Sequence, residues 1–125
     1  MCAGQSELSP AGCRDLMELG AVDYCNFDSS WSGGPTSWRR AAAIASSYGV
    51  ALGHHEEPHI STHLLASQVL GGYAECFHPD RDPFWWSLAR GSDHLVGGAV
   101  QLTERPGFGW HLDEDYVEEH RLPRA

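Results

Sequence analysis

The amino-acid sequence predicts an α/β domain in which parallel strands alternate with helices. Three short apolar stretches are each followed by a segment whose apolar residues recur at three- and four-residue steps, as in an amphipathic helix. Gly20, Gly49 and Gly71 stop these helical segments. Strands that alternate with helices of about 10 to 15 residues pair in parallel through right-handed crossovers. With 125 residues and 42% hydrophobic content, the chain is long enough to bury a core.

The first strand and helix are visible only in part. The segment CAGQSE, residues 2–7, is expected to be the carboxyl end of a strand that begins before the first residue. Ser9 is a typical N-cap, and Pro10 suits the first helical position. We therefore predict a helix that begins at Pro10 and stops at Gly20.

The second and third units follow the same plan. AVDYCNFD (21–28) is a predicted strand, and a helix is predicted over 36–49. VALGH (50–54) is the next strand, HEEPH (55–59) a loop and ISTHLLASQVL (60–70) a helix. The apolar face of the second helix comprises Trp38, Ala41, Ala42, Ala45 and Tyr48.

The remainder of the chain is less regular. A fourth apolar stretch, YAECF (73–77), precedes HPDRDPFWWSL (78–88), whose Pro, Asp and aromatic residues favour a packed loop. The tail from residue 97 onward has a short strand, the turn RPGFG and a final polar segment. The whole pattern resembles half of a (β/α) barrel, which takes about 250 residues.

Composition excludes several classes of function. The net charge is −9 and the eight Lys and Arg residues are scattered, whereas nucleic-acid binders need clustered basic residues. The four Cys form no C-x-x-C pair, so neither a zinc ribbon nor a disulfide framework is indicated. The first residues lack the basic start and apolar segment of a signal peptide, and no apolar run approaches the ~18 residues of a membrane span. We expect a cytoplasmic protein without membrane or nucleic-acid partners.

Polar side chains stand at the carboxyl end of every predicted strand. In parallel α/β folds these ends meet at one edge, where catalytic side chains collect. A buried charge without a partner costs several kcal/mol, so we expect these groups to face one another, a metal or a polar ligand. The residues at the four strand ends are Gln5 and Glu7, Asp28, His54 and His55, and Glu75.

Asp28 and a histidine on the next strand form the most informative pair. A carboxylate bonded to one imidazole nitrogen fixes the tautomer and raises the basicity of the other nitrogen, which makes a candidate general base. Glu75 on the fourth strand would then supply a proton donor or an anchor. Each of these residues taken alone is also compatible with a purely structural role, because buried polar groups are usually hydrogen-bonded.

Three stretches in this order and spacing resemble the enolase superfamily, in its mandelate racemase and acid-sugar dehydratase branch. They are GQSELSPAGCRDLMELGAVDYCNFDSSWSGG, GVALGHHEEPHISTHLLAS and GYAECF. The resemblance implies a capping domain and a (β/α)7β barrel that binds Mg²⁺ and removes the proton next to a substrate carboxylate. Residues 1–125 are then expected to be the C-terminal portion of the barrel domain, about the fifth to eighth strands plus the tail. Without the capping domain and early strands, we expect an incomplete, inactive chain.

The resemblance also implies roles for individual residues. Asp28 and His55 match the family's His-Asp dyad, and Glu75 matches the glutamate that contacts the substrate carboxylate or oxyanion. His54 precedes the dyad histidine, so strand alternation turns it away from the barrel interior. Glu57 lies in the following loop, where substrate contact is expected.

A departure from the family pattern concerns the metal. Gln5 stands where the family has a glutamate ligand, and an amide oxygen binds Mg²⁺ more weakly than a carboxylate does. Glu7 is two residues farther on, hence expected on the same strand face, and is a candidate substitute ligand.

Three functions are compared. Dehydration of a sugar acid is favoured, with His55 as base or acid and a small-molecule carboxylate as substrate. Racemisation or epimerisation of a 2-hydroxy acid is the near alternative, because it shares the proton abstraction. A non-catalytic metal-binding module is the alternative of another class, since His54, His55, His59 and His63 fall within ten residues; against it, His59 is expected in a loop. The family resemblance also implies a homo-oligomer.

Overall fold

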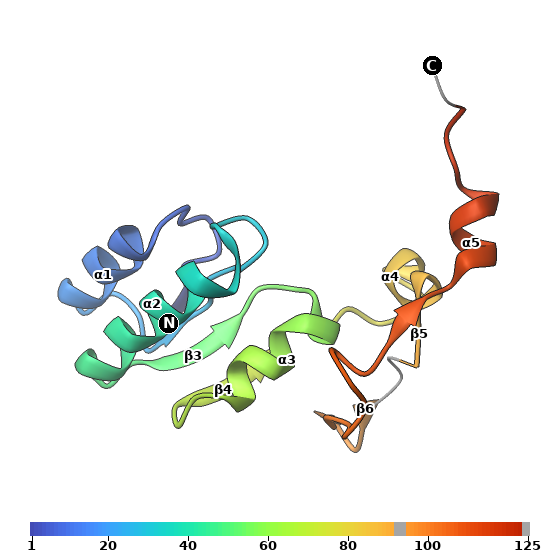
Figure 1. The fold of residues 1–125 in the computed structure, drawn as a ribbon. Helices are drawn as coiled ribbons and strands as arrows, with labels where there is room; N and C mark the ends of the chain where they lie inside the picture. Colours follow the sequence, from blue (N-terminus) through green and yellow to red (C-terminus); the bar gives the residue numbers. More distant parts are fainter. Residues whose placement is uncertain (92–94, 124–125) are drawn as a thin grey trace. The chain divides into compact units, whose positions relative to one another are not determined.

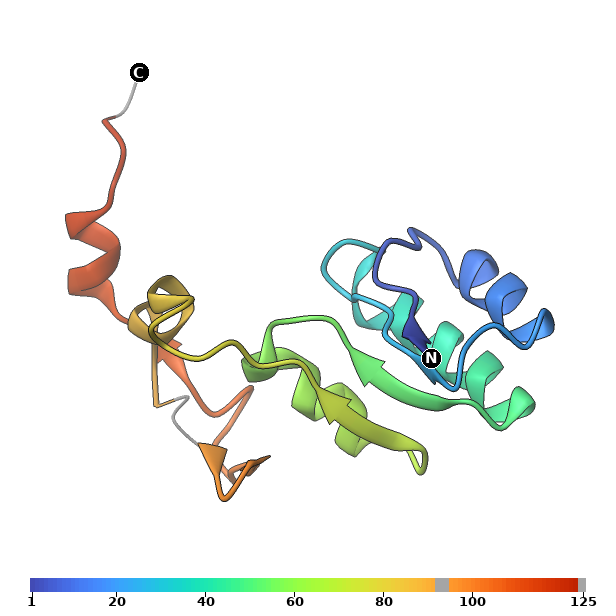
Figure 2. The same ribbon diagram turned by 180° about the vertical axis from the view of Figure 1, so that it is seen from behind.

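The computed structural model describes residues 1–91 and 95–123 (Figure 1). The chain divides into two compact units, Met1–Cys76 and Phe77–Ala125, which Figure 2 shows from behind. The first unit carries the repeated strand and helix pattern, and the second carries the short elements of the C-terminal part.

The first unit is built on a four-stranded parallel sheet whose strands lie in chain order. The strands are β1 (Cys2–Ala3), β2 (Tyr24–Cys25), β3 (Ala51–His54) and β4 (Gly71–Ala74). This confirms the predicted α/β class. All four strands run the same way, so the residues that follow them gather at one edge of the sheet (Figure 1).

Helices connect the successive strands, and local sequence signals set their ends. They are α1 (Pro10–Glu18), α2 (Gly34–Tyr48) and α3 (Pro58–Ala66). The Ser9 hydroxyl accepts the Gly12 N–H at 3.4 Å, which caps α1 as predicted. Gly49 ends α2 with a φ of 67°, a left-handed conformation that glycine adopts without steric cost.

One face of the sheet packs against the helices and forms the core. Trp38 of α2 is fully buried, and its indole N–H donates to the Phe27 carbonyl at 3.1 Å. Tyr48, predicted on the buried face of the helix, is instead 45% exposed, because it is the last residue of α2. The core comprises Cys13, Met17, Val22, Cys25, Phe27, Trp38, Ala41, Ala42, Ala45, Val50, Leu52 and Leu65.

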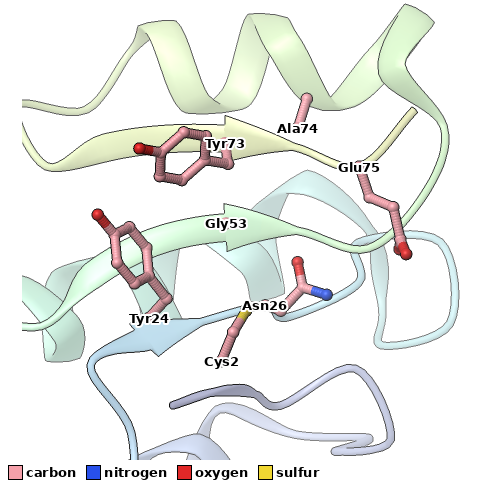
Figure 3. Close-up of a pocket in the computed structure, with 7 residues that line it drawn as sticks. All are labelled: Cys2, Tyr24, Asn26, Gly53, Tyr73, Ala74 and Glu75. Atoms are coloured by element: carbon pink, nitrogen blue, oxygen red, sulfur yellow. The ribbon is translucent and has the colours of Figure 1, made fainter.

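The other face of the sheet carries a shallow pocket of about 270 Å³ (Figure 3). The rings of Tyr24 and Tyr73 lie on it with their centroids 5.4 Å apart. Asn26 and Gly53 line its centre, and Glu75 lies where the strands end.

The second unit contains two short helices and two small antiparallel pairs. Helix α4 (Pro83–Leu88) precedes β5 (Ala89–Arg90), which pairs with β8 (His111–Leu112). Strands β6 (Leu95–Val96) and β7 (Ala99–Val100) form a second pair. Helix α5 (Glu114–Glu119) begins after Asp113, whose side chain accepts the Tyr116 N–H at 3.1 Å.

Several predicted boundaries differ from the structure. The segment 78–88 is not a loop throughout, because Pro83 begins α4. Helix α3 begins at Pro58 for the same reason, so His59 is helical and buried rather than in a loop. Regular pairing in the predicted strand 21–28 is limited to β2. Across 1–91 and 95–123, no helix is long and apolar enough to cross a membrane.

Candidate functional site

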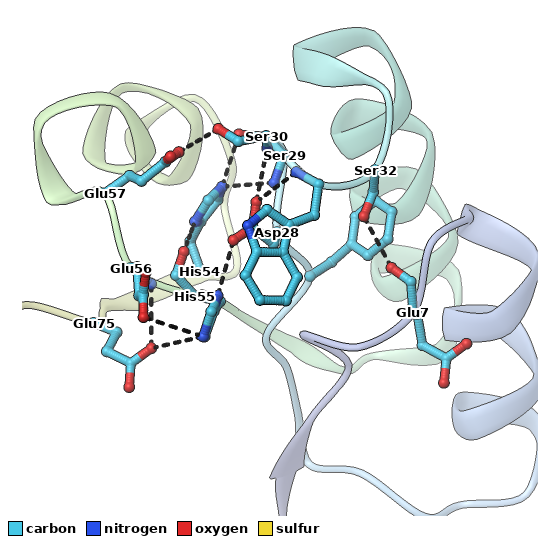
Figure 4. Close-up of polar contacts among 12 residues, drawn as sticks. Glu7, Asp28, Ser29, Ser30, Ser32, His54, His55, Glu56, Glu57 and Glu75 are labelled. Atoms are coloured by element: carbon cyan, nitrogen blue, oxygen red, sulfur yellow. Dashed lines mark hydrogen bonds and ion pairs between the residues drawn. The ribbon is translucent and has the colours of Figure 1, made fainter. Parts of the chain in front are cut away.

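Asp28 is a buried carboxylate, 1% exposed, in the loop between β2 and α2. Its Oδ1 accepts the backbone N–H groups of Ser30 at 2.7 Å and Trp31 at 3.0 Å. Two amide donors offset the cost of burying the charge and hold the plane of the carboxylate. Oδ2 is thereby aimed at the neighbouring strand end (Figure 4).

His55 meets Asp28 at that strand end. Cys25 pairs with Leu52, so the residues three positions farther along each strand, Asp28 and His55, come side by side. His55 Nδ1 lies 2.9 Å from Asp28 Oδ2. Because a carboxylate can only accept a hydrogen bond, Nδ1 carries a proton that it donates to Asp28, and in the neutral ring the lone pair is then on Nε2. The contact expected from the sequence is present, and the Trp31 ring adds an edge contact at 5.2 Å from the imidazole.

The open nitrogen of His55 faces two further carboxylates. Nε2 lies 3.8 Å from Glu75 Oε2 and 3.6 Å from Glu56 Oε1. The Glu56 N–H donates to Glu75 Oε2 at 3.2 Å, which ties the third and fourth strand ends together. Glu75 therefore lies near His55, as its predicted position at the end of the fourth strand indicates. Glu56 lies in the predicted loop 55–59 and is not among the predicted site residues, although its position directly after His55 in the sequence is a signal that could have found it.

The chain turns sharply just after His55. Glu56 and Glu57 have φ values of 50° and 51°, a left-handed conformation that costs a non-glycine residue about 1 to 3 kcal/mol and is concentrated at functional sites. The Ser30 hydroxyl donates to the Glu57 carboxylate, which links this turn to the loop after β2. Glu57 thus lies beside the Asp28 loop, at the rim of the site (Figure 4).

His54 points the opposite way from His55, as strand alternation predicted. Its ring is fully buried and stacks on Trp38, with centroids 6.1 Å apart. Nε2 lies 3.1 Å from the Ser29 N–H nitrogen and 3.0 Å from the Ser29 hydroxyl, and Nδ1 lies 2.7 Å from the His55 carbonyl oxygen. Burial disfavours the charged ring and lowers the pKa of His54.

Gln5 and Glu7 do not share a strand face, which corrects the expectation. Strand β1 ends at Ala3, and the Glu7 N–H donates to the Gly4 carbonyl at 3.0 Å across a turn that contains Gln5. The Glu7 carboxylate lies against Gly12 at the start of α1, so close that a Cβ there would be 1.8 Å from Oε2. Figure 4 shows this carboxylate pointing away from His55. Two-residue alternation applies only within a strand, and the turn reverses it.

The described side chains do not assemble a metal centre by themselves. Within 1–91 and 95–123, no three His, Cys, Asp or Glu side chains are grouped so that they could hold a metal ion. Glu7 does not join Gln5 as a pair of ligands in this arrangement, because its carboxylate lies against Gly12. The histidine-rich stretch does not converge either, because His54 and His55 point to opposite faces of β3.

Comparison with known proteins gives a consistent result. Residues 1–116 match the family model described as enolase C-terminal domain-like. The chain is 32% identical to a putative L-rhamnonate dehydratase of Caldivirga maquilingensis, over 94% of this chain and 31% of the relative. It is 29% identical to an L-rhamnonate dehydratase of Saccharopolyspora erythraea, over 92% of this chain and 31% of that relative. The chain thus spans about a third of the length of these relatives.

Solved structures show the same relationship. A mandelate racemase/muconate lactonizing enzyme from a marine actinobacterium, solved with magnesium, is 63% identical with a TM-score of 0.92, over 98% of this chain and 35% of that one. The L-talarate dehydratase of Polaromonas sp. JS666, solved with Mg and L-glucarate, is 26% identical with a TM-score of 0.79, over 90% of this chain and 30% of that one. The fold is that of the corresponding part of these TIM-barrel enzymes.

Proposed function

Because the chain belongs to the enolase C-terminal domain-like family, we propose that it supplies the acid–base residues of an enzyme that removes the proton next to a carboxylate and dehydrates a sugar acid. The observation that carries the proposal is the 2.9 Å contact between His55 Nδ1 and Asp28 Oδ2. Dehydratases of L-rhamnonate and D-xylonate among the relatives support a sugar acid as substrate.

The first step is proton abstraction by His55. Its Nε2 lone pair takes the proton from the carbon next to the substrate carboxylate, and the C–H electrons move into that carboxylate to give an ene-diolate. The imidazolium that forms is stabilised by Asp28, which accepts a hydrogen bond from Nδ1–H throughout.

The second step is loss of the β-hydroxyl group. The ene-diolate electrons form a carbon–carbon double bond as the carbon–oxygen bond breaks, and the imidazolium gives its proton to the leaving oxygen. Water and an enol are released, the enol becomes a 2-keto acid, and His55 returns to the neutral form. One histidine thus serves as base and then as acid.

Glu75 and Glu57 are proposed to hold the substrate. Glu75 lies 3.8 Å from His55 Nε2 and is anchored by the Glu56 N–H, so a substrate that reaches Nε2 also meets this carboxyl group. In its protonated form Glu75 can donate a hydrogen bond to the substrate carboxylate or the ene-diolate. We propose that Glu57, at the rim, contacts substrate hydroxyl groups.

Magnesium is the cofactor we propose, supported by the two solved relatives that contain it. Gln5, just after β1, is the residue of this chain that we propose as a ligand. Glu7 does not fit that role, because its carboxylate packs on Gly12. The proton transfers above use only groups of this chain. A homo-oligomer and a cytoplasmic location stay predictions.

The test uses a chimera in which residues 1–125 replace the matching third of the marine actinobacterial relative, which is 63% identical. It is assayed against a panel of sugar and 2-hydroxy acids, with release of 2-keto acid scored as dehydration and inverted configuration without keto acid as epimerisation. His55→Asn should lower kcat by about 10²- to 10⁴-fold, the usual contribution of a general acid–base group. His78→Asn, at an exposed site, is the matched control. Normal turnover by the His55→Asn chimera refutes the proposal.

A further inference from the structure

His54 is a fully buried polar ring in the core of the first unit. An aromatic or aliphatic residue would fill the same space against Trp38 without any need for hydrogen bonds. The ring nevertheless has a partner for each nitrogen, and both partners belong to the backbone segments that present Asp28 and His55. The placement of these partners points to a role in the neighbouring site.

The protonation state of His54 follows from its contacts. Nε2 is approached by the backbone N–H of Ser29, which can only donate, so Nε2 carries a lone pair and no proton. The Ser29 hydroxyl donates to the same nitrogen at 3.0 Å. The ring proton is therefore on Nδ1, where it is donated to the His55 carbonyl at 2.7 Å. Lowering of the pKa by burial favours this neutral form.

The ring thus joins the two loops that hold the acid–base pair. Ser29 is bonded directly to Asp28 in the chain, and the carbonyl that accepts from Nδ1 is that of His55 itself. A further side-chain contact between the two loops, from Ser30 to Glu57, is exposed. The buried bond from Trp38 to the Phe27 carbonyl joins the loop after β2 to α2 and does not reach His55. The bonds of Asp28 to Ser30 and Trp31 move with their own loop, so they fix the plane of the carboxylate but not its distance from His55.

We propose that His54 is a positioning residue, which holds the loop after β2 at the distance that lets Asp28 keep His55 in the Nδ1–H form. His54 does not touch the substrate. The inference rests on the proposed function in that the pair it positions is the one that transfers the proton. The effect of His54 on the tautomer of His55 can be measured without any substrate being converted.

Two substitutions separate the two hydrogen bonds of His54, the one that Nδ1 donates to the His55 carbonyl and the one that Nε2 accepts from Ser29. In His54→Asn, the new amide can reproduce the Nδ1–H donor to the His55 carbonyl but not the acceptor at Nε2. In His54→Gln, the longer side chain can present an oxygen where Nε2 was and so keep the Ser29 donors. The readout is the long-range ¹H–¹⁵N spectrum of the ¹⁵N-histidine-labelled 125-residue chain, in which His55 is assigned by loss of its signals in His55→Asn.

We expect the Nδ1–H form of His55 in the unaltered chain and in His54→Gln, and a mixture of the two tautomers in His54→Asn. In the chimera, kcat of His54→Asn should fall by about 10- to 100-fold at nearly constant KM, as expected for misplacement by a fraction of an ångström to one ångström. An unchanged His55 tautomer in His54→Asn overturns the proposal. Equal tautomer changes in both variants also overturn it, because they assign His54 to core packing alone.

A second variant guards against failure of His54→Asn to fold. Ser29→Ala removes one of the two donors to Nε2, at a buried position but without changing His54 or the apolar core residues. A minor Nε2–H population of His55 is expected, and an unchanged spectrum contradicts the proposal. Urea unfolding of all variants reports the packing contribution separately. If the chimera converts none of the acids, the proposed function fails, whereas the tautomer of His55 still decides the role of His54.

Discussion

Replacing Asp28 with Asn tests the acid–base pair at its most sensitive point. Oδ1 of Asp28 accepts two backbone N–H groups, from Ser30 and Trp31, and the oxygen of the new amide would keep these bonds. The amide nitrogen then replaces Oδ2, 2.9 Å from His55 Nδ1. An N–H in that place donates, so His55 must present a lone pair at Nδ1 and carry its proton on Nε2. The nitrogen that faces the substrate can then no longer accept a proton.

The expected fall in kcat of Asp28→Asn follows from the loss of one general base. Such a group contributes about 10²- to 10⁴-fold in rate, or about 3 to 5 kcal/mol of transition-state stabilisation. The fold should lose much less, about 1 kcal/mol, because the charged acceptor of Ser30 and Trp31 becomes a neutral one that keeps both bonds. A large effect on kcat with a small effect on unfolding is therefore the expected signature.

The assay combines kcat and KM of the chimera with the histidine ¹⁵N spectrum of the 125-residue chain. Asp80→Asn is the matched control, because Asp80 also lies near a histidine, His78, at 3.6 Å, but at an exposed site. Asp28→Asn should move His55 to the Nε2–H form, and Asp80→Asn should change neither readout. Retention of the Nδ1–H form of His55 with near-normal kcat would refute the reasoning.

Two further predictions concern stability of the 125-residue chain. Burial lowers the pKa of His54 below its ordinary 6.5, so below that pH the unfolded chain binds a proton that the folded chain excludes. The free energy of unfolding should therefore fall as the pH drops from 6.5. Urea midpoints between pH 7.5 and 5 check this, and His54→Gln should flatten the pH dependence. Trp38→Phe removes the 3.1 Å bond to the buried Phe27 carbonyl and should cost about 1 to 3 kcal/mol in urea unfolding. Trp31→Phe, at a 59% exposed site, should change stability by less than about 0.5 kcal/mol. An equal loss of stability in both variants would contradict a stabilising role for the buried bond from Trp38 to Phe27.

Much of the site could be located from the sequence because strand parity and strand order are written in its pattern. Apolar periodicity defined the strands, and parallel pairing brought their carboxyl ends to one edge, so Asp28 and a histidine of the next strand end were expected to be neighbours, and the family resemblance indicated His55. The same parity turned His54 toward the helices and His55 toward the open face. The cap at Ser9 and the stop at Gly49 were equally local and were also confirmed.

The features of the site that the sequence left undetermined lie in turns. Glu7 was placed by alternation beyond the end of β1, yet a turn directs its carboxylate to Gly12. Glu56 comes within 3.6 Å of His55 Nε2 only because it and Glu57 adopt left-handed φ values. The left-handed conformation of Glu56 and Glu57 does not follow from residue type, because non-glycine residues enter this region only where the surrounding structure imposes it.

The sequence by itself thus determined the α/β alternation, the caps at Ser9 and Gly49, and the meeting of Asp28 with a histidine at one sheet edge, since these depend on periods of 2 and 3.6 residues and on short-range hydrogen bonds. The family resemblance pointed to His55 as that histidine. The tertiary structure alone decided the direction of Glu7, the approach of Glu56 and the bonds between His54 and Ser29. Those depend on where loops distant in sequence come to rest, and no periodic pattern records the dihedral angles of a loop.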